Sequence, residues 1–413
     1  MALTFNLAFN LHFLRSEKLR SKANLKGRNS AVALPPLSSL SSFREVEIKS
    51  KIESKKQAPR HPTPSSPTPD TRHPKMPRPL LIPMLLILAV PPLRSDEMTP
   101  ESKTAIRRGL AWLVRNQEKV GSWRTATTRP DHMGLMGLAC VALMSAGNTP
   151  GRGEYGAELS RALDFIIKNA KPNGLLHIGP AHYDMYNHGL ATLALAEAYG
   201  MSHSPKIKAK LVRAVDLIVD CQGPRGGWQY VARPGDHDTS LCVMQMMALR
   251  AAINSGIYVP KETVDKAVKY LLGHHNKETG GFGYSGPAGI NVPMSSAGAV
   301  SLQAAGKLTW DSKEGMPVRK SLDWLLDNPS AKNLPNGGHG YYATYYYAQA
   351  MYQAGDKYWR VSYPRLRDNL VKAQSKSGYW KGSGAGPIMA TSIAVMVLCI
   401  PNRYLPIFQE ERD

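Results

Sequence analysis

The feature that most constrains this chain is a repeat of about 53 residues. A short amphipathic signature begins at Gly109, Ala162, Ala214, Ala267 and Ser321, so that successive copies start 53, 52, 53 and 54 residues apart. Leu370-Val371 supplies a weaker sixth copy. A fixed period of this length predicts stacked supersecondary units, because one such unit buries its apolar face only against its neighbours.

A glycine-aromatic turn follows most of these signatures. The copies are Gly121-Ser122-Trp123, Gly226-Gly227-Trp228, Gly280-Gly281-Phe282, Gly337-Gly338-His339 and Gly378-Tyr379-Trp380, with Asn173-Gly174-Leu175 as a degenerate version. Glycine permits a tight bend, and the large ring is expected to wedge between repeats. The turns are therefore predicted to join the two helices of each repeat.

Two kinds of helix alternate along the chain. The outer kind is amphipathic: Ile207, Leu211, Val215 and Ile218 recur at helical spacing, with lysines on the remaining surface. The inner kind is almost free of charge and rich in Ala, Gly and Met, and it covers 133–146, 185–199, 239–253, 295–305, 341–354 and 388–399. A helix that is apolar all round is buried on all sides.

Six helices of each kind predict an all-α fold, an (α/α)6 toroid of about six helix hairpins over residues 98–413. Most inner helices are expected to end at a glycine, namely Gly147, Gly200, Gly256, Gly306 and Gly355. An open solenoid is the alternative arrangement. The closed ring is favoured because the sixth repeat is as apolar as the first and no charged capping repeat appears.

The first 97 residues differ from the repeats. Residues 1–75 are rich in Ser, Pro, Lys and Arg and predict a disordered basic segment. Residues 76–97 resemble a secretory signal, with a short basic start and an apolar stretch at 80–90. We therefore expect Met76 to be the true start and the protein to be exported to the periplasm or beyond. The poor cleavage site leaves a membrane anchor through 80–90 as the alternative, and Met1 as the start remains open.

Charge and cysteine content exclude some partners. The 413 residues carry a formal net charge of +21, much of it in the first 75 residues. Since no basic-aromatic motif appears, we expect no nucleic-acid partner. The four cysteines, Cys140, Cys221, Cys242 and Cys399, form no Cys-x-x-Cys pair. They predict buried free thiols rather than a disulfide framework or a zinc knuckle.

Superposition of the inner helices on their Ala-Leu cores predicts a polar rim. His132, Asp184, Asp238, Asn291 and His339 fall at one level, at the N-terminal ends of these helices. One turn further in, Met136, His188, Cys242, Ser295 and Ala343 share a second level. Helix capping alone explains such residues, and Asp238-Thr239-Ser240 is a good cap sequence. A ligand site is the other interpretation, because a polar rim above an apolar cavity is typical of functional sites.

The turns resemble the QW repeats of squalene cyclases. Gln117 and Gln222 each lie four residues before the glycine of a Gly-x-Trp turn. Over about 104–401 the chain is similar to the terpenoid-cyclase and protein-prenyltransferase superfamily, and most of all to its exported squalene-cyclase-like, prenyltransferase-repeat bacterial members. The resemblance implies an α/α toroid. It leaves the chemistry open, because this fold carries several activities.

The same resemblance singles out Asp236, His237 and Asp238 as candidate catalytic residues. The cyclases carry an Asp-x-Asp-Asp acid motif, and here Asp238 matches its last aspartate, while His237 replaces the proton-donating one. Because the motif is incomplete, whether the chain is an enzyme stays open. The prenyltransferases imply zinc, for which Asp238, Cys242 and His188 are the candidate ligands. Their Asp-x-Cys spacing is missing, and no cofactor is firmly predicted.

Three functions remain open. The first is an exported toroid that holds an apolar, isoprenoid-like ligand in a central cavity, with His132, Asp184, His188, Cys242, His339 and Tyr345 at its rim and wall. The second is a secreted, non-catalytic scaffold for a protein partner of unknown identity. The third is a carbohydrate-active toroid, which requires paired carboxylates such as Asp184 and Asp238.

Overall fold

The computed structural model describes residues 97–124, 132–179, 183–306, 315–383 and 385–408. The predicted disordered segment 1–75 and all but the last residue of the signal-like segment 76–97 lie outside these residues, so both remain predictions. No helix within the described ranges has the length and apolar character needed to cross a membrane.

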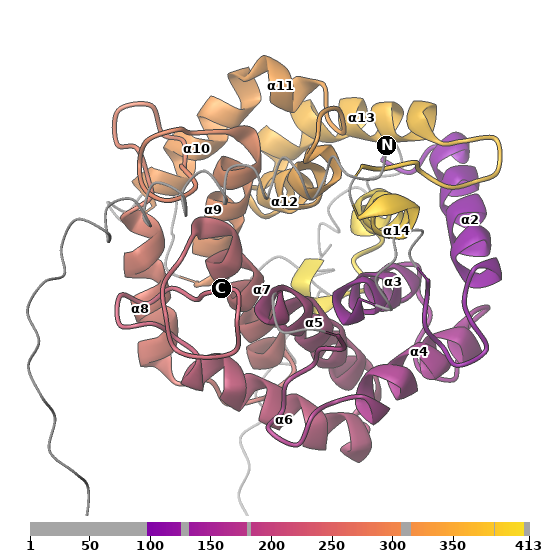
Figure 1. Cartoon of the computed structure of the whole chain (residues 1–413). Coiled ribbons are helices and arrows are strands. Elements are labelled where there is room, and N and C mark those ends of the chain that lie inside the picture. Colours follow the sequence, from indigo (N-terminus) through magenta and orange to yellow (C-terminus); the bar gives the residue numbers. More distant parts are fainter. Residues whose placement is uncertain (1–96, 125–131, 180–182, 307–314, 384, 409–413) are drawn as a thin grey trace, which may run out of the picture. The chain divides into compact units, whose positions relative to one another are not determined.

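Within the described residues, twelve long helices form two concentric series (Figure 1). The outer series is α2 (Pro100–Arg115), α4 (Gly156–Lys168), α6 (Pro205–Asp220), α8 (Lys261–Leu272), α10 (Met316–Asp327) and α13 (Asp356–Ala373). The inner series is α3 (Met133–Ser145), α5 (Asp184–Ser202), α7 (Thr239–Asn254), α9 (Val292–Ala304), α12 (Gly340–Gln353) and α14 (Gly386–Cys399). Short helices complete the chain at α11 (Pro329–Lys332), η1 (Ile400–Asn402) and η2 (Pro406–Phe408).

The ring is closed. The last inner helix, α14, packs against both α12 and the first inner helix α3, and the last outer helix, α13, packs against α2. The described residues contain no β-strand, only isolated bridges. The predicted all-α (α/α)6 toroid of six helix hairpins is confirmed.

Apolar patterning explains which helices lie inside. Every residue of α3 is buried, as expected for a helix without a polar face. Helix α6 buries only one stripe, formed by Ile207, Leu211, Ala214, Val215 and Ile218, and presents its lysines to solvent. The amphipathic helices therefore lie outside because only they have a face that remains favourable in water.

The glycine-aromatic turns fasten each repeat to the next. In repeat three, the Gln222 side-chain amide donates to the carbonyls of Gly226 (3.0 Å) and Thr263 (2.9 Å), the second of which belongs to the next outer helix. The Trp228 indole N–H donates to the Ile218 carbonyl (2.7 Å). Gly226 has φ +101° and lies so close to the Lys266 carbonyl that a Cβ atom would clash.

The same three contacts recur in the first and sixth repeats. Gln117 and Trp123 repeat the pattern at the start of the ring. Gln374 bonds to the carbonyls of Gly378 and Ala105, both at 2.8 Å, and so ties repeat six to repeat one. The turn motif is therefore also the closing device of the ring.

Two sequence expectations fail locally. Gly337 has no neighbouring helix against it, because α11 is inserted between α10 and this turn, so Gly337-Gly338-His339 is not equivalent to the other turns. Helix α5 continues past Gly200 to Ser202 and ends with His203 in the left-handed conformation. Gly147, Gly256, Gly306 and Gly355 do adopt positive φ just beyond their helices, as predicted.

The chain after α14 folds back over the inner helices. Helix η2 contacts α5, α7 and α12, and Leu405 and Ile407 are buried there. Since this segment directly follows the C-terminus of α14, it covers the end of the inner ring opposite to the predicted rim. The rim end is called the mouth below.

Candidate functional site

Asp238 is the centre of a hydrogen-bonded cluster at the mouth. It is the N-cap of α7 and its side chain is completely buried. Its Oδ1 accepts hydrogen bonds from the Leu241 backbone N–H (3.1 Å) and the Ser240 hydroxyl (2.5 Å). Its Oδ2 accepts from the Tyr230 hydroxyl (3.0 Å) and lies 2.8 Å from His237 Nδ1. The cap interpretation is correct, but capping uses only one of the four contacts.

Tyrosines from three repeats surround this carboxylate. Tyr186 comes from α5 and its hydroxyl bonds to Ser240, while the Tyr230 hydroxyl lies 2.6 Å from that of Tyr284. The ring of Tyr230 packs tilted on Tyr186, with 5.6 Å between centroids, and edge-on to Tyr183, at 5.8 Å. All these hydroxyls and rings converge beside one carboxylate. We call Asp238, His237, Ser240, Tyr186, Tyr230 and Tyr284 the Asp238 cluster.

The Asp238 cluster places one ionised carboxylate beside neutral tyrosine hydroxyls. Burial acts to raise the pKa of Asp238, but hydrogen bonds from His237, Ser240 and Tyr284 outweigh it, and the pKa lies below the ordinary value. Burial, reinforced by the nearby Asp238 charge, raises the pKa values of the Tyr186, Tyr230 and Tyr284 hydroxyls. The carboxylate is therefore ionised at neutral pH, while the tyrosines stay protonated as donors.

His237 is the member of the cluster that combines a charged partner with access to solvent. Its side chain is 37% exposed, whereas Asp238 is fully buried. The ring lies edge-on to Tyr230 with centroids 4.7 Å apart. Because the carboxylate accepts from Nδ1–H, the neutral tautomer carries its lone pair on Nε2. This arrangement makes His237 a base that is oriented by Asp238.

Asp236, the third predicted catalytic residue, serves the neighbouring turn. Its carboxylate accepts hydrogen bonds from the backbone N–H groups of Arg225 (3.0 Å) and Gly227 (2.6 Å). It also forms an ion pair with the Arg225 guanidinium at 3.6 Å. Asp236 therefore shapes the Gly226-Gly227-Trp228 turn and makes none of the contacts that hold Asp238.

The remaining rim residues have separate surroundings. Asp184, the first residue of α5, accepts from the Ala232 backbone N–H at 3.3 Å and lies 3.4 Å from His177 Nε2. Asn291 caps α9 through the Met294 N–H. His132 and His339 stand at the N-cap positions of α3 and α12 without a side-chain cap bond, and burial lowers the pKa of His339. The structure thus places the five at helix starts but does not join them in one network.

The predicted second level faces outward, not into a cavity. His188 Nδ1 accepts from the Leu176 backbone N–H at 3.1 Å, and its Nε2 lies 2.9 Å from the Ala214 carbonyl of α6. Burial lowers its pKa to about 4. Ser295 and Thr391 make the equivalent bond to the turn N–H of Phe282 and Trp380. His188 was expected to line the cavity wall, and this is corrected: it holds its own turn.

Cys242 likewise lies against the outer ring. Its Sγ is 4.0 Å from the Ala267 carbonyl of α8, and burial raises the pKa of the thiol well above its usual value. With both nitrogens of His188 occupied, the proposed ligand set of Asp238, Cys242 and His188 does not converge on one point. Among the described residues, no three His, Cys, Asp or Glu side chains are grouped to hold a metal ion. All four cysteines are free and buried.

The face of the inner helices opposite to this second level points to the ring interior. On α5 that face carries Tyr186, Leu190 and Glu197 at helical spacing. Helices α7 and α12 are separated by α9, so the 3.2 Å contact from the Tyr346 hydroxyl to Met244 Sδ crosses the interior. The interior is therefore filled one turn below Ser240.

Tyr345 is buried deeper in the interior, and its role as the wall of a ligand cavity stays a prediction. It lies on α12, opposite α5 in the ring, and the nearby Glu197 adds to the effect of burial in raising its pKa. Burial raises the pKa of Glu197 itself to about 8, which the backbone of Ile407 partly offsets. Neither Glu197 oxygen has a partner with normal hydrogen-bond geometry.

Sequence reasoning missed Tyr230, Tyr284 and Glu197. The period itself contains a signal for the first two, because Tyr230 and Tyr284 are 54 residues apart, as are the bonded residues Tyr186 and Ser240. An acid in the apolar middle of an inner helix, far from the helix start, is the signal for Glu197.

Comparison with known proteins identifies the fold class. No protein-family model and no curated protein sequence matches the chain. Among solved structures, an inactive double Asp-to-Asn variant of the α-1,6-mannanase GH76A of Salegentibacter sp. HEL1_6, in complex with α-1,6-mannotriose, matches with a TM-score of 0.58 at 10% identity. That match covers 73% of this chain and 99% of the mannanase.

Two further structures match as well. An Asp-to-Asn variant of the type II terpene cyclase MstE from Scytonema, in complex with geranylgeranyl dihydroxybenzoate, has a TM-score of 0.53, 14% identity and coverage of 76% and 100%. A protein from Actinoplanes has a TM-score of 0.53, 14% identity and coverage of 73% and 99%. The chain thus shares the α/α toroid fold of the mannanase and the terpene cyclase, and at such low identity the matches show the fold alone.

Proposed function

We propose that the mouth of the toroid binds a hydroxyl-rich ligand of the carbohydrate class, and that His237 exchanges a proton with it. The observation that carries this proposal is the 2.8 Å contact between His237 Nδ1 and the buried Asp238 carboxylate. A carboxylate that fixes an imidazole in one tautomer leaves the other ring nitrogen as a proton acceptor for the ligand.

The surroundings of the pair suit a polar ligand with apolar faces. Tyr186, Tyr230 and Tyr284 are half-buried, so each combines a ring with a protonated hydroxyl at the mouth. Sugars present both C–H faces and hydroxyl groups, and tyrosine offers a complement to each. The Tyr346–Met244 contact below the mouth favours a ligand that stays at the entrance.

The carboxylates favour binding with proton transfer over two-carboxylate hydrolysis. Glycoside hydrolysis in most families uses two carboxyl groups that flank the scissile bond. Here Asp184 and Asp236 are held by backbone N–H groups elsewhere, so Asp238 lacks a carboxyl partner within its cluster. The mannanase variant named above lost two adjacent aspartates, whereas in this chain His237 separates Asp236 from Asp238.

A second candidate ligand is an isoprenoid chain held along the ring axis. The inward face of α7 below Ser240 consists of Met244, Met247 and Ala251, and that of α5 includes Leu190 and Leu193. This apolar lining is compatible with a prenyl group, but the bound isoprenoid would first have to displace the Tyr346 side chain from Met244. A scaffold for a protein partner is the remaining alternative.

Ligand-observed NMR with two probes separates these candidates. We expect α-1,6-mannotriose to give saturable transfer signals, and geranylgeranyl dihydroxybenzoate to give weaker ones. Tyr230→Phe should weaken sugar binding about fivefold, because one hydrogen bond of about 1 kcal/mol is lost. Binding of the prenyl compound alone would replace the proposal with the isoprenoid candidate, and binding of neither probe would favour the scaffold.

The role of His237 has its own readout. His237→Gln keeps a hydrogen-bonding side chain beside Asp238 but removes the imidazole that is proposed to contact the ligand. The affinity of this variant for the sugar should fall about fivefold, because one hydrogen bond of about 1 kcal/mol is lost. Equal affinities of the two proteins would exclude His237 from the proposed role.

Export remains part of the proposal and rests on the sequence of residues 76–97 alone. Intact-mass measurement of the purified protein determines its N-terminus. A chain that begins near Met76, or after a cleaved signal, supports export, and one that begins near Met1 contradicts the proposed start.

A further inference from the structure

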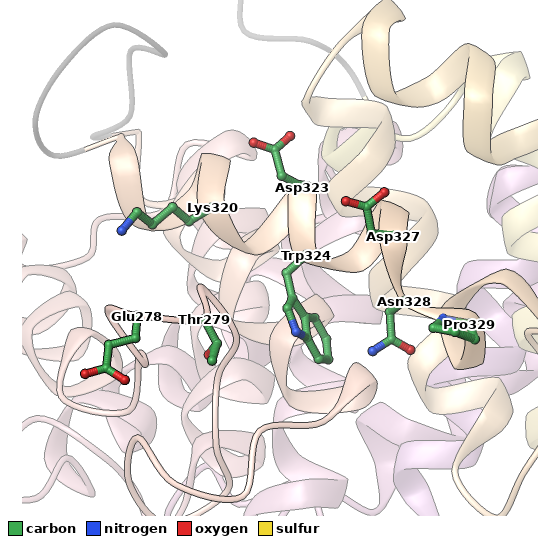
Figure 2. Close-up of a pocket in the computed structure, with 8 residues that line it drawn as sticks. All are labelled: Glu278, Thr279, Lys320, Asp323, Trp324, Asp327, Asn328 and Pro329. Atoms are coloured by element: carbon green, nitrogen blue, oxygen red, sulfur yellow. The ribbon is translucent and has the colours of Figure 1, made fainter.

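A groove of about 520 Å³ lies beside the outer helix α10 (Figure 2). It is formed by α10, by the first residue of α11 and by the residues just before the Gly280 turn. The half-buried indole of Trp324 stands in it, and Figure 2 shows Thr279 and Asn328 on either side of the ring. We call this feature the Trp324 groove.

Comparison of the repeats explains why this indole is uncovered. Apart from Gly337, the turn glycines pack against the next outer helix, for example Gly378 against Arg108 and Gly280 against Lys320. Four residues further along those helices stand Trp112 and Trp324, which are therefore equivalent. The Tyr379 ring, directly after Gly378, covers Trp112 with centroids 5.1 Å apart.

At the position of Tyr379, the fourth repeat has Gly281. In the third repeat the same position is Gly227, but there the Tyr270 ring lies directly against it and fills the space. Among the described residues, no aromatic ring covers Trp324, the atoms nearest to Gly281 belong to Ser295 and Ile290, and α11 forms the other wall of the space that results. The groove thus departs from the packing of the equivalent rings in repeats three and six.

The polar groups of the groove are held in place by their own neighbours. Asn328 Oδ1 caps α11 by accepting from the Ser330 N–H at 2.9 Å, which fixes the amide beside the indole. Lys320 Nζ donates to the Lys277 carbonyl at 2.8 Å, and Asp323 accepts from the Tyr358 hydroxyl at 2.8 Å. Preorganised side chains of this kind lose little entropy when a ligand binds.

We propose that the Trp324 groove is a saccharide-binding site, in which a sugar ring stacks on the indole and its hydroxyls bond to Thr279, Asn328 and Asp327. An exposed indole face pairs with the C–H face of a sugar, and hydroxyl, amide and carboxylate groups satisfy its oxygens. The charged residues that line the groove are Glu278, Asp323, Asp327 and Lys320, so its formal charge is negative and an anionic sugar is disfavoured.

This site deepens the proposed function by giving the same ligand class a second point of attachment, and in that sense rests on it. The two sites are nevertheless physically separate. The mouth lies at the inner helix starts of α5 and α7, and the groove lies on the outer helix α10. A long saccharide that binds both gains affinity through effective concentration.

Fluorine NMR of the full chain labelled with 5-fluorotryptophan tests the groove directly. Trp324→Phe identifies the Trp324 resonance by its disappearance. On addition of α-1,6-mannotriose or cellotriose, we expect that resonance to shift saturably while the resonance of the covered Trp112 stays unchanged. Thr279→Val removes one hydroxyl at nearly constant shape. The affinity obtained by following the Trp324 resonance should be about fivefold weaker in this variant.

Two results would overturn the proposal: a Trp324 resonance that neither probe moves, or equal shifts of Trp112 and Trp324, which indicate nonspecific contact. His237→Gln separates the two sites. If the groove binds the sugar and the mouth does not, the Trp324 resonance shifts with the same apparent affinity in the wild type and in His237→Gln. If only the mouth binds, His237→Gln weakens sugar binding and the Trp324 resonance moves in neither protein.

Discussion

Two buried carboxyl groups on neighbouring inner helices reach opposite protonation states. Asp238 at the start of α7 has four hydrogen-bonding contacts, and its pKa is lowered although its side chain is fully enclosed. Glu197 on α5 is equally enclosed but has no such contacts, and its pKa is raised to about 8. Burial alone predicts the same shift for both, so the hydrogen-bond donors decide the charge.

The difference distinguishes the mouth from the ring interior. At the mouth, loops from successive repeats bring tyrosine, serine and histidine donors to one carboxylate. Glu197 lies about three helical turns beyond Tyr186 on α5, which is about 16 Å along the helix axis. The surrounding helices offer it few hydrogen-bond donors. An ionised group is therefore available where a ligand enters, and the deeper interior stays uncharged at neutral pH.

The largest expected effect comes from removal of the Asp238 carboxylate. Asp238→Ala leaves the donors of Leu241, Ser240 and Tyr230 without their acceptor, and should reduce the free energy of unfolding by about 3 kcal/mol. Urea denaturation gives the value. Asp238→Asn is the matched variant: it retains the cap, should cost about 1 kcal/mol, and should lose ligand binding with the charge. Equal, small losses in both variants would reduce Asp238 to a simple cap.

The next effect concerns Glu197 at alkaline pH. Between pH 4.5 and about 8 the unfolded chain releases this proton and the folded protein keeps it, so stability declines as pH rises and the contribution is lost above about 8. Glu197→Gln mimics the neutral form and should be more stable than wild type by about 2 kcal/mol at roughly pH 9. Thermal unfolding across pH measures this, and parallel curves for the two proteins would contradict the raised pKa.

His188 should produce a smaller effect in acid. Its folded pKa of about 4 lies below the unfolded value of 6.5, so its contribution is present above pH 6.5 and is lost as pH falls toward 4. Wild type should lose roughly 1–2 kcal/mol between neutral pH and about pH 5 through this residue. His188→Ser copies Ser295, the equivalent residue of repeat four, and should flatten that part of the profile. If His188→Ser lost as much stability as wild type on acidification, His188 would not be the buried, neutral imidazole inferred here.

The smallest effect on stability is expected for His237→Gln. The side chain is 37% exposed and Asp238 keeps three other donors, so the free energy of unfolding should change by less than about 0.5 kcal/mol. Chemical denaturation at neutral pH checks this. A loss as large as that of Asp238→Ala would make His237 a structural member of the cluster and weaken its proposed role at the ligand.

Part of the candidate site could be predicted from the sequence. The rim position of Asp238 followed from aligning the inner helices, and its cap role followed from Asp238-Thr239-Ser240. The outward direction of His188 and Cys242 did not follow, because a helix without a polar face gives no indication of which side meets the outer ring. The zinc hypothesis failed for this reason: residues at one level of a ring point outward together.

The sequence by itself determined the ring. A constant period, six inner helices with almost no charge and the recurring Gln, Gly and Trp positions act through contacts between neighbouring repeats, and such contacts are encoded locally. The tertiary structure completed the chemistry of the mouth, because it adds Tyr284 and Tyr230 from separate loops to the sequence neighbours His237 and Ser240 around Asp238, and because it leaves Glu197 without such donors. A pKa depends on the groups around a carboxyl in space, and spacing along the chain does not specify them.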